Sequence, residues 1–68
     1  MVMQILLNGE NKAVSGPLTV AQLLEQLSLT GRRVAVEINQ EIVPRSRHAA
    51  HQLKEHDRVE VVFAIGGG

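Results

Sequence analysis

One segment of this sequence has the apolar periodicity of a helix, and segments with the periodicity of strands lie on both sides of it. Within residues 20–27, large apolar side chains recur at positions i, i+3, i+4 and i+7, which places them on one face of a helix. These residues are Val20, Leu23, Leu24 and Leu27. A single helix cannot bury such a face by itself, so the strands around it must form the other layer of the core.

Short-range signals mark both ends of this helix. Thr19 is suited to the N-cap, because Gln22 stands three residues later and can complete a capping box. Leu18 and Leu23 occupy the two positions of a hydrophobic staple. Gly31 is the residue type that most often follows the last turn of a helix. The helix is therefore predicted to begin just after Thr19 and to end at Gly31.

Two strands are predicted before the helix. Side chains alternate over residues 3–7, and Asn8-Gly9 then supplies the positive φ angles that a two-residue type I′ turn requires. Residues 12–14 return from this turn, and the sequence Ser-Gly-Pro at 15–17 breaks regular structure. We expect a hairpin whose second strand is short and lies at a sheet edge.

A second hairpin is predicted after the helix. Side chains alternate over residues 34–38, and after Asn39-Gln40 the chain resumes as a strand at residues 41–43. Pro44 then stops that strand, because proline lacks the N–H that a sheet needs.

The last third of the sequence contains a polar connection and the clearest strand. Residues 45–57 are polar, with room for one helical turn and with Leu53 as their apolar anchor. Residues 58–65 alternate strongly, which predicts a strand. Its apolar face consists of Val59, Val61, Phe63 and Ile65.

The predicted order is two strands, a helix and three strands, ββαβββ. A chain of 68 residues is too short for a doubly wound sheet, so we expect an α+β fold. In it, one mixed sheet carries the helix packed across one face. Residues 1–65 form the domain, and residues 66–68 form a flexible glycine tail.

Composition excludes several classes of function. The chain has no cysteine, so it has no disulfide, no thiolate nucleophile and no cysteine-based metal site. Its formal net charge is zero and Phe63 is its single aromatic residue, which argues against nucleic-acid binding. Its longest apolar run, residues 61–65, is too short for a membrane span, and its start does not resemble a signal peptide. We expect a cytoplasmic protein without a bound cofactor.

Nothing in the sequence predicts catalysis. Ser15, Ser28 and Ser46 lack the surroundings of a nucleophile, and the only glycine-rich segment is at the end of the chain. His48 and His51 stand at i and i+3 with His56 nearby, a spacing that could hold a metal on a helical turn. Few carboxylates stand at matching offsets, which favours polar loop histidines. His56 also suits a turn position with positive φ.

Four arginines flank the second predicted hairpin, namely Arg32, Arg33, Arg45 and Arg47. They could form a basic patch for an acidic partner. They could equally be a solvated surface, and the sequence alone leaves both interpretations open.

The run Gly66-Gly67-Gly68 directly after a strongly patterned strand is the unusual feature of this sequence. It is either a frayed terminus or a functional tail. Because glycine has no Cβ, such a tail can pass through a narrow channel and deliver a terminal carboxylate into a partner's active site. Ordering three glycines opposes binding by roughly 3 to 6 kcal/mol, so the globular part must bind the partner as well. The candidate partner-binding residues are Leu6, Arg45, Val62 and Ala64.

Several segments resemble one known family. They are residues 4–10 (QILLNGE), residues 19–24 (TVAQLL), residues 36–45 (VEINQEIVPR) and the terminal Gly67-Gly68. Together they are similar to the ThiS family, the sulfur carrier proteins of thiamine biosynthesis, and the resemblance runs essentially from end to end.

The resemblance implies a ubiquitin-like β-grasp fold with the first and last strands side by side in parallel. It implies a carrier and not an enzyme: a ThiF-like adenylating enzyme, using ATP and Mg²⁺, would activate the carboxylate of Gly68. Sulfur from cysteine, passed on by a cysteine desulfurase, would convert it to a thiocarboxylate. Thiazole synthase would then use that sulfur for the thiazole of thiamine, while Gly66 and Gly67 provide steric clearance.

Two alternatives to this interpretation remain. The small subunit of molybdopterin synthase resembles the same fold and shares the Gly-Gly end. A plain β-grasp interaction module, whose glycines are only a disordered end, is the other. The sequence also departs from the family at His56-Asp57, where Gly-Asp is common, and this concerns the geometry of that turn.

Overall fold

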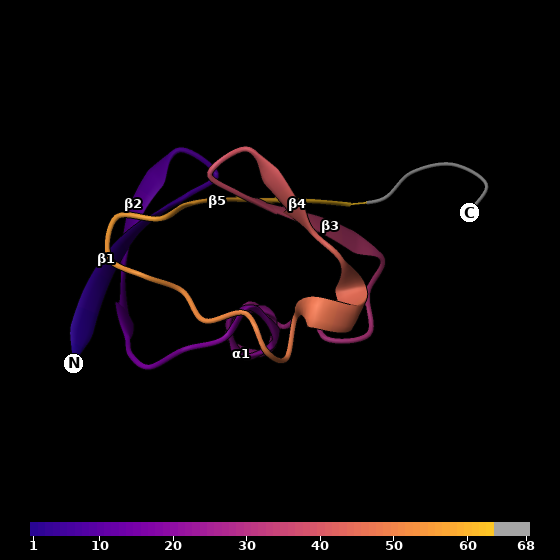
Figure 1. The fold of residues 1–68 in the computed structure, drawn as a ribbon, viewed down its shortest axis with the longest axis horizontal. Coiled ribbons are helices and arrows are strands. Elements are labelled where there is room, and N and C mark those ends of the chain that lie inside the picture. The colour runs from indigo at the N-terminus through magenta and orange to yellow at the C-terminus, as the bar shows by residue number, and fades with distance from the viewer. Residues whose placement is uncertain (64–68) are drawn as a thin grey trace.

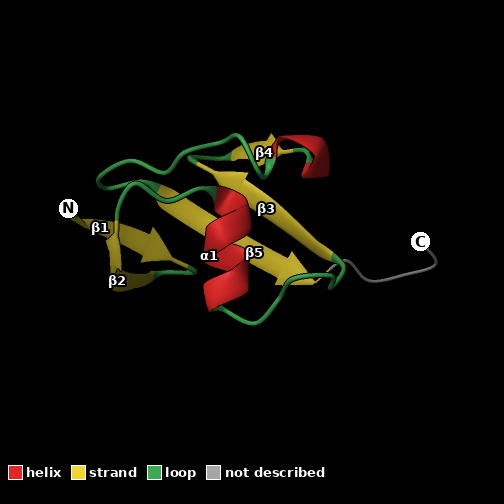
Figure 2. Cartoon of the chain, turned by 90° about the horizontal axis from the view of Figure 1, so that it is seen from below, coloured by secondary structure: helices red, strands yellow, loops and turns green. Residues whose placement is uncertain are grey.

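A five-stranded mixed sheet forms one layer of the computed structural model, which describes residues 1–63. The strands are β1 (Val2–Leu7), β2 (Glu10–Ser15), β3 (Val34–Ile38), β4 (Glu41–Val43) and β5 (Arg58–Phe63), in the sheet order β2-β1-β5-β3-β4. The helix α1 (Val20–Gln26) lies across one face of the sheet (Figure 2). The predicted α+β fold with a mixed sheet is confirmed, and β5 is parallel to β1 as expected.

Both hairpins are closed by two-residue turns with positive φ. Asn8 has φ 49° and Gly9 has φ 85°, and Asn39 and Gln40 have φ 53° and 71°. The edge position of β2 is confirmed, but β2 is longer than predicted. It pairs with β1 along the whole strand, because the tight turn keeps the two strands in register from the first pair onward.

The start of α1 is the predicted one. Thr19 Oγ1 accepts a hydrogen bond from Gln22 N at 3.2 Å, and Gln22 Oε1 accepts one from Thr19 N at 2.9 Å. This is the reciprocal capping box that the sequence indicates.

The predicted end of the helix is wrong. Ser28 N donates to Glu25 O at 3.0 Å and Leu29 N donates to Leu24 O at 2.8 Å, the two bonds of a Schellman motif. Ser28 adopts the left-handed conformation, φ 60°, that usually falls to glycine. Leu29 packs against the core, and this apolar contact turns the chain before it reaches Gly31.

The long connection between β4 and β5 docks against the first turn of α1. It begins with the predicted single helical turn, the 3₁₀ helix η1 (Arg45–Arg47). Val20 N donates to His51 O, and Ala21 N donates to His48 O, both at 2.9 Å. Leu53 is buried as predicted, and Figure 1 shows this connection passing close to the helix. Loop carbonyls thus satisfy helix N–H groups that have no partner within the helix.

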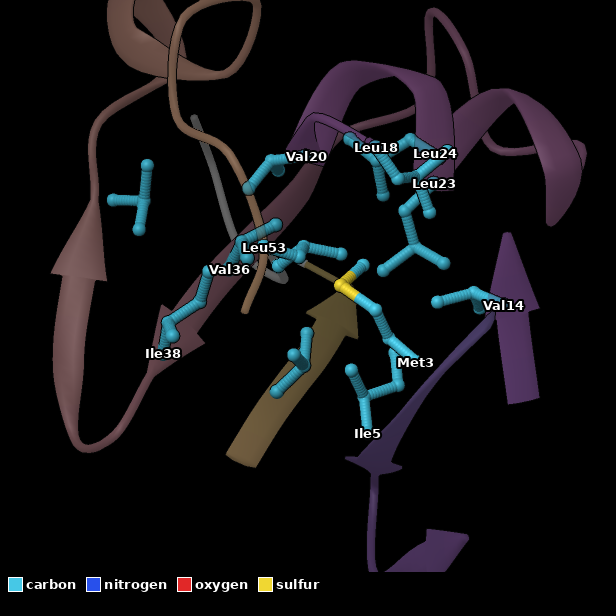
Figure 3. Packing of buried hydrophobic residues seen from close by; sticks show 12 residues of the cluster. Met3, Ile5, Val14, Leu18, Val20, Leu23, Leu24, Val36, Ile38 and Leu53 are labelled. Carbon is cyan, nitrogen blue, oxygen red and sulfur yellow. The ribbon is translucent and has the colours of Figure 1, made fainter. Parts of the chain in front are cut away.

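One apolar cluster fills the space between α1 and the sheet. Figure 3 shows side chains of the helix meeting those of β1 and β3. Its fully buried members are Met3, Ile5, Val20, Leu23, Val36 and Val59. Leu27, the last residue of the predicted helical stripe, is the C-cap of the helix and packs against the core half-buried.

A parallel seam joins the first hairpin to the rest of the sheet. We define the parallel seam as the contacts between residues 4–8 and residues 55–61. Its backbone hydrogen bonds run from His56 N to Gln4 O (2.7 Å), from Leu6 N to Asp57 O (2.9 Å) and from Asn8 N to Val59 O (2.8 Å).

The side chain of Asn8 extends the parallel seam beyond the end of β1. Its Oδ1 accepts from Val61 N at 2.8 Å, and its Nδ2 donates to Val61 O at 3.2 Å. The carboxamide therefore bonds to both backbone groups of Val61, as another strand residue would.

The other turn asparagine holds the start of β5. Asn39 Oδ1 accepts from Arg58 N at 3.0 Å, and its Nδ2 donates to Asp57 Oδ1 at 3.1 Å. Asp57 is buried, and its Oδ2 accepts from Lys54 N at 2.8 Å. Both oxygens of this buried carboxylate are satisfied, and β5 is fixed by one hairpin turn at each end.

We expect Asn8→Gly to lower the free energy of unfolding by about 1–2 kcal/mol, because it removes two hydrogen bonds to Val61 while keeping the positive φ. Urea denaturation measures this change. Gln40→Gly is the matched control: it relieves a side chain at positive φ and should not destabilise the protein. Equal unfolding midpoints for Asn8→Gly and the unmutated chain would contradict the role of the carboxamide.

Candidate functional site

The central strand β5 leads toward the predicted glycine tail. Phe63, the last residue of β5, pairs with Val34 at the start of β3. The chain continues into residues 64–68, which lie outside the described residues, so the predictions for Ala64 and for Gly66, Gly67 and Gly68 concern that part. The candidate surfaces are therefore those beside Phe63.

One of these surfaces is the sheet face opposite α1, which we call the open face. Leu6 and Val62 both lie on it, because each alternates with residues that face the core. Val62 is 56% exposed and pairs with Ala35 of β3. Ile42 of β4 adds a further exposed apolar side chain, 69% exposed. The structure thus puts two predicted partner-binding residues on the same face of the sheet.

Two carboxylates interrupt the open face. Glu37 of β3 stands directly opposite Glu60 of β5, and Ile42 is the cross-strand neighbour of Glu37 on its other side. Like charges directly opposite each other destabilise a sheet. This pair could not be predicted from the sequence, because it depends on the register between strands that are far apart in the chain.

Arg45 lies away from the open face, next to another arginine. Its Nη2 donates to the backbone oxygen of Arg32 at 3.4 Å. The guanidinium of Arg32 stands 5.4 Å from the centre of the Phe63 ring, within range of a cation–π contact. Arg33 is exposed, and Arg47 lines a different hollow, beside β4. Arg32 and Arg45 are therefore joined by a hydrogen bond and line one groove, whereas Arg47 lines another hollow.

A groove opens between these two arginines and the helix. Its volume is about 230 Å³. Residues of α1, of the turn after it, and of η1 and the loop that follows line this groove: Ala21, Leu24, Leu29, Thr30, Gly31, Arg32, Val34, Arg45, His48 and Ala49. Among residues 1–63, the lining combines apolar side chains with guanidinium groups and contains no carboxylate.

The three histidines have separate surroundings. His48 is buried and its Nε2 donates to Val43 O at 3.1 Å, because a carbonyl oxygen can only accept. His56 is exposed, with φ 68°, so its predicted positive φ is confirmed. Residues 1–63 contain no group of three potential metal-ligating side chains. Within the same residues, no helix is long and apolar enough to cross a membrane.

The topology and the site together define a class of protein. A mixed sheet with β5 in the middle, parallel to β1 and antiparallel to β3, and with one helix across one face, is the ubiquitin-like β-grasp fold. The chain belongs to the ThiS family, whose sequence profile matches residues 5–68. The resemblance seen in the sequence is thereby confirmed.

Individual relatives agree with this assignment. The sulfur carrier protein ThiS of Escherichia coli is 39% identical over 66 residues, which are 97% of this chain and 100% of that protein. The crystal structure of the thiamine biosynthesis protein ThiS from Geobacter metallireducens superposes with a TM-score of 0.83 at 35% identity. That match covers 97% of this chain and 100% of the Geobacter chain.

A second kind of relative is much longer. A thiazole synthase of Paramagnetospirillum magneticum is 44% identical over 66 residues, and one of Magnetococcus marinus is 42% identical over 66 residues. Each match covers 97% of this chain, and the chain spans only 20% of the length of these two proteins. In both, a region similar to this chain is part of a longer polypeptide named thiazole synthase.

We expect His56→Gly to raise the free energy of unfolding by about 1 kcal/mol, because glycine adopts positive φ without the steric penalty of a Cβ. Thermal or urea denaturation measures the change. His56→Ala is the matched control, since it also removes the imidazole but keeps the Cβ and should bring no gain. A stabilisation by both variants would show that the imidazole, and not the backbone, is unfavourable there.

Proposed function

We propose that this chain is a sulfur carrier of thiamine biosynthesis, and that Gly68 carries the sulfur as a thiocarboxylate. The observation that carries the proposal is the family match, which extends through the glycines to residue 68. The full-length similarity to a protein named sulfur carrier protein ThiS supports it. In this role the chain is a cosubstrate that enzymes act on, and it works in the cytoplasm.

A carboxylate at Gly68 needs activation before it can accept sulfur. A free α-carboxyl has an ordinary pKa of about 3.5, so at pH 7 it is an anion that repels nucleophiles. A ThiF-like adenylating enzyme would use ATP and Mg²⁺ to form the acyl-adenylate with release of pyrophosphate. The outer sulfur of a desulfurase persulfide, which originates from cysteine, would then displace AMP and form an acyl persulfide. A thiol would reduce its S–S bond, which releases the thiocarboxylate and leaves a disulfide on the donor side. The chain itself holds neither the ATP nor the metal ion in this scheme.

The described residues hold the strand that precedes this terminus firmly in place. β5 has strands on both sides, and the Asn8 carboxamide bonds to Val61 near its end. Because β5 is hydrogen-bonded on both sides, it fixes the point from which the residues after it would extend toward an enzyme. Leu6 and Val62 on the open face are apolar surface that an enzyme could bury to offset the ordering of the glycines.

Thiazole synthase is the enzyme that we propose takes sulfur from the carrier. Two relatives that contain a region similar to this chain are named thiazole synthase, which supports a functional link between the two. A carrier and its acceptor enzyme benefit from being close together, because a tether raises their effective concentration.

The intact mass of the protein, with no extension after Gly68, tests the proposal. After incubation with ATP, cysteine and a desalted lysate of its source cells, we expect a mass gain equal to sulfur replacing one oxygen. Fragmentation should map the gain to Gly68. A known sulfur carrier in the same lysate is the positive control. If that control is modified while this chain gains neither sulfur nor AMP, the chain is an interaction module and the proposal fails.

We expect Gly67→Val to leave the fold intact and to abolish adenylation, because a branched side chain cannot follow glycine into a narrow channel. ATP–pyrophosphate exchange with the adenylating enzyme measures the effect, and urea denaturation checks the fold. Ala50→Val is the matched control, since it adds the same branched atoms at an exposed position outside the open face and the groove, and it should leave exchange near the unmutated rate. Normal exchange with Gly67→Val would contradict the need for clearance.

A further inference from the structure

The groove between α1 and Arg45 lies beside the end of β5. Arg32 at its rim stacks over the ring of Phe63, and Val34 in its lining pairs with Phe63. Any enzyme that takes up the residues after Phe63 is therefore brought next to this groove. The open face lies on the other side of the sheet, so the two surfaces can meet different parts of a partner.

The size of the groove indicates what kind of ligand it fits. Its volume of about 230 Å³ is below the roughly 300–1,000 Å³ of pockets that hold drug-sized ligands. A groove of this size suits one or two side chains of a partner protein. Leu24, Leu29 and Val34 offer them an apolar floor, and Leu24 is 7% exposed and so belongs to the core as well.

The charge of the groove indicates that the partner side chain is acidic. Arg32 and Arg45 are both cationic, and none of the lining residues is acidic. The contact of Arg45 with the Arg32 carbonyl and the contact of Arg32 with the Phe63 ring restrain both guanidinium groups. Restrained guanidinium groups are well suited to carboxylates, because they can donate two parallel hydrogen bonds to one carboxylate.

We propose that this groove binds an acidic segment of the thiazole synthase partner. An apolar side chain of that segment enters between Leu29 and Val34, and a neighbouring Asp or Glu carboxylate pairs with Arg45 and Arg32. The inference rests on the proposed function for the identity of the enzyme. It adds a binding surface on the helix side of the sheet, separate from the open face, and gives Arg45 a specific role.

Charge reversal at the rim is the first test. The probe is the thiazole synthase of the organism from which the chain comes, with sulfur-loaded carrier as the varied substrate. We expect Arg32→Glu and Arg45→Glu each to raise KM for the carrier by about tenfold or more, and to weaken its dependence on salt. Arg33→Glu is the matched control, since Arg33 carries the same charge next to Arg32 but does not line the groove.

Filling the groove is the second test. Ala49 lines the groove and is exposed, so Ala49→Phe blocks it without disturbing the core, and it should raise KM as the charge reversals do. Ala50→Phe is the matched control, because Ala50 is also exposed but is not part of the lining. Urea denaturation of every variant separates loss of binding from loss of folding.

The remaining outcomes overturn the proposal. If the Arg45 and Ala49 variants keep the KM of the unmutated carrier, the groove binds nothing in this reaction. If they change only ATP–pyrophosphate exchange, the adenylating enzyme occupies it instead. Binding of unloaded carrier to the synthase, measured by calorimetry, keeps the test independent of sulfur loading. Absence of loading would count against the proposed function, while equal calorimetric affinities of the Arg33→Glu and Arg45→Glu variants would count against the groove.

Discussion

The parallel seam between residues 4–8 and 55–61 is the interaction on which the remainder of this structure depends. Each hairpin can form from residues close together in the chain, but neither hairpin buries an apolar face alone. The seam pairs Leu7 of the first hairpin with Val59 on the core side of the sheet. The helix covers this side, where Met3 and Ile5 are buried in the same cluster as Val59. Because the paired segments are about fifty residues apart, closing this contact costs more loop-closure entropy than any other strand pairing in the sheet.

The parallel seam would be weakest where β1 ends, and Asn8 strengthens it there. β1 ends at Leu7 while β5 continues to Phe63, which would leave backbone groups of β5 without a partner on that side. The carboxamide of Asn8 takes the place of the missing strand residue. The same side chain that permits the turn conformation thus also joins the turn to the central strand. Hairpin geometry and sheet assembly are linked in one residue.

Features that depend on neighbouring residues could be predicted from the sequence. The capping box at Thr19 and the turn at Asn8-Gly9 involve residues within a few positions of each other, so their patterns are visible in the sequence. The end of the helix could not be predicted from the sequence. Ser28 adopts a conformation usual for glycine, and Leu29 after it packs against the core. That choice depends on tertiary packing, which the local pattern does not contain.

In the candidate site, too, local features could be predicted from the sequence and long-range contacts could not. Leu6 and Val62 could be assigned to one face because side chains alternate along a strand, and the alternation is a local property. The pairing of Arg45 with Arg32 could not be foreseen, because it needs the turn after the helix and the turn after β4 to meet. Contacts of this kind arise only when the sheet has placed its strands.

The position of β5 also determines when this protein can fold during its synthesis. Among the described strands, the one in the middle of the sheet follows the other four in the chain, so a nascent chain has two separate hairpins until residues 58–63 have emerged. Before that point its apolar side chains remain open to proteases and chaperones. Folding therefore reports that translation has passed the central strand.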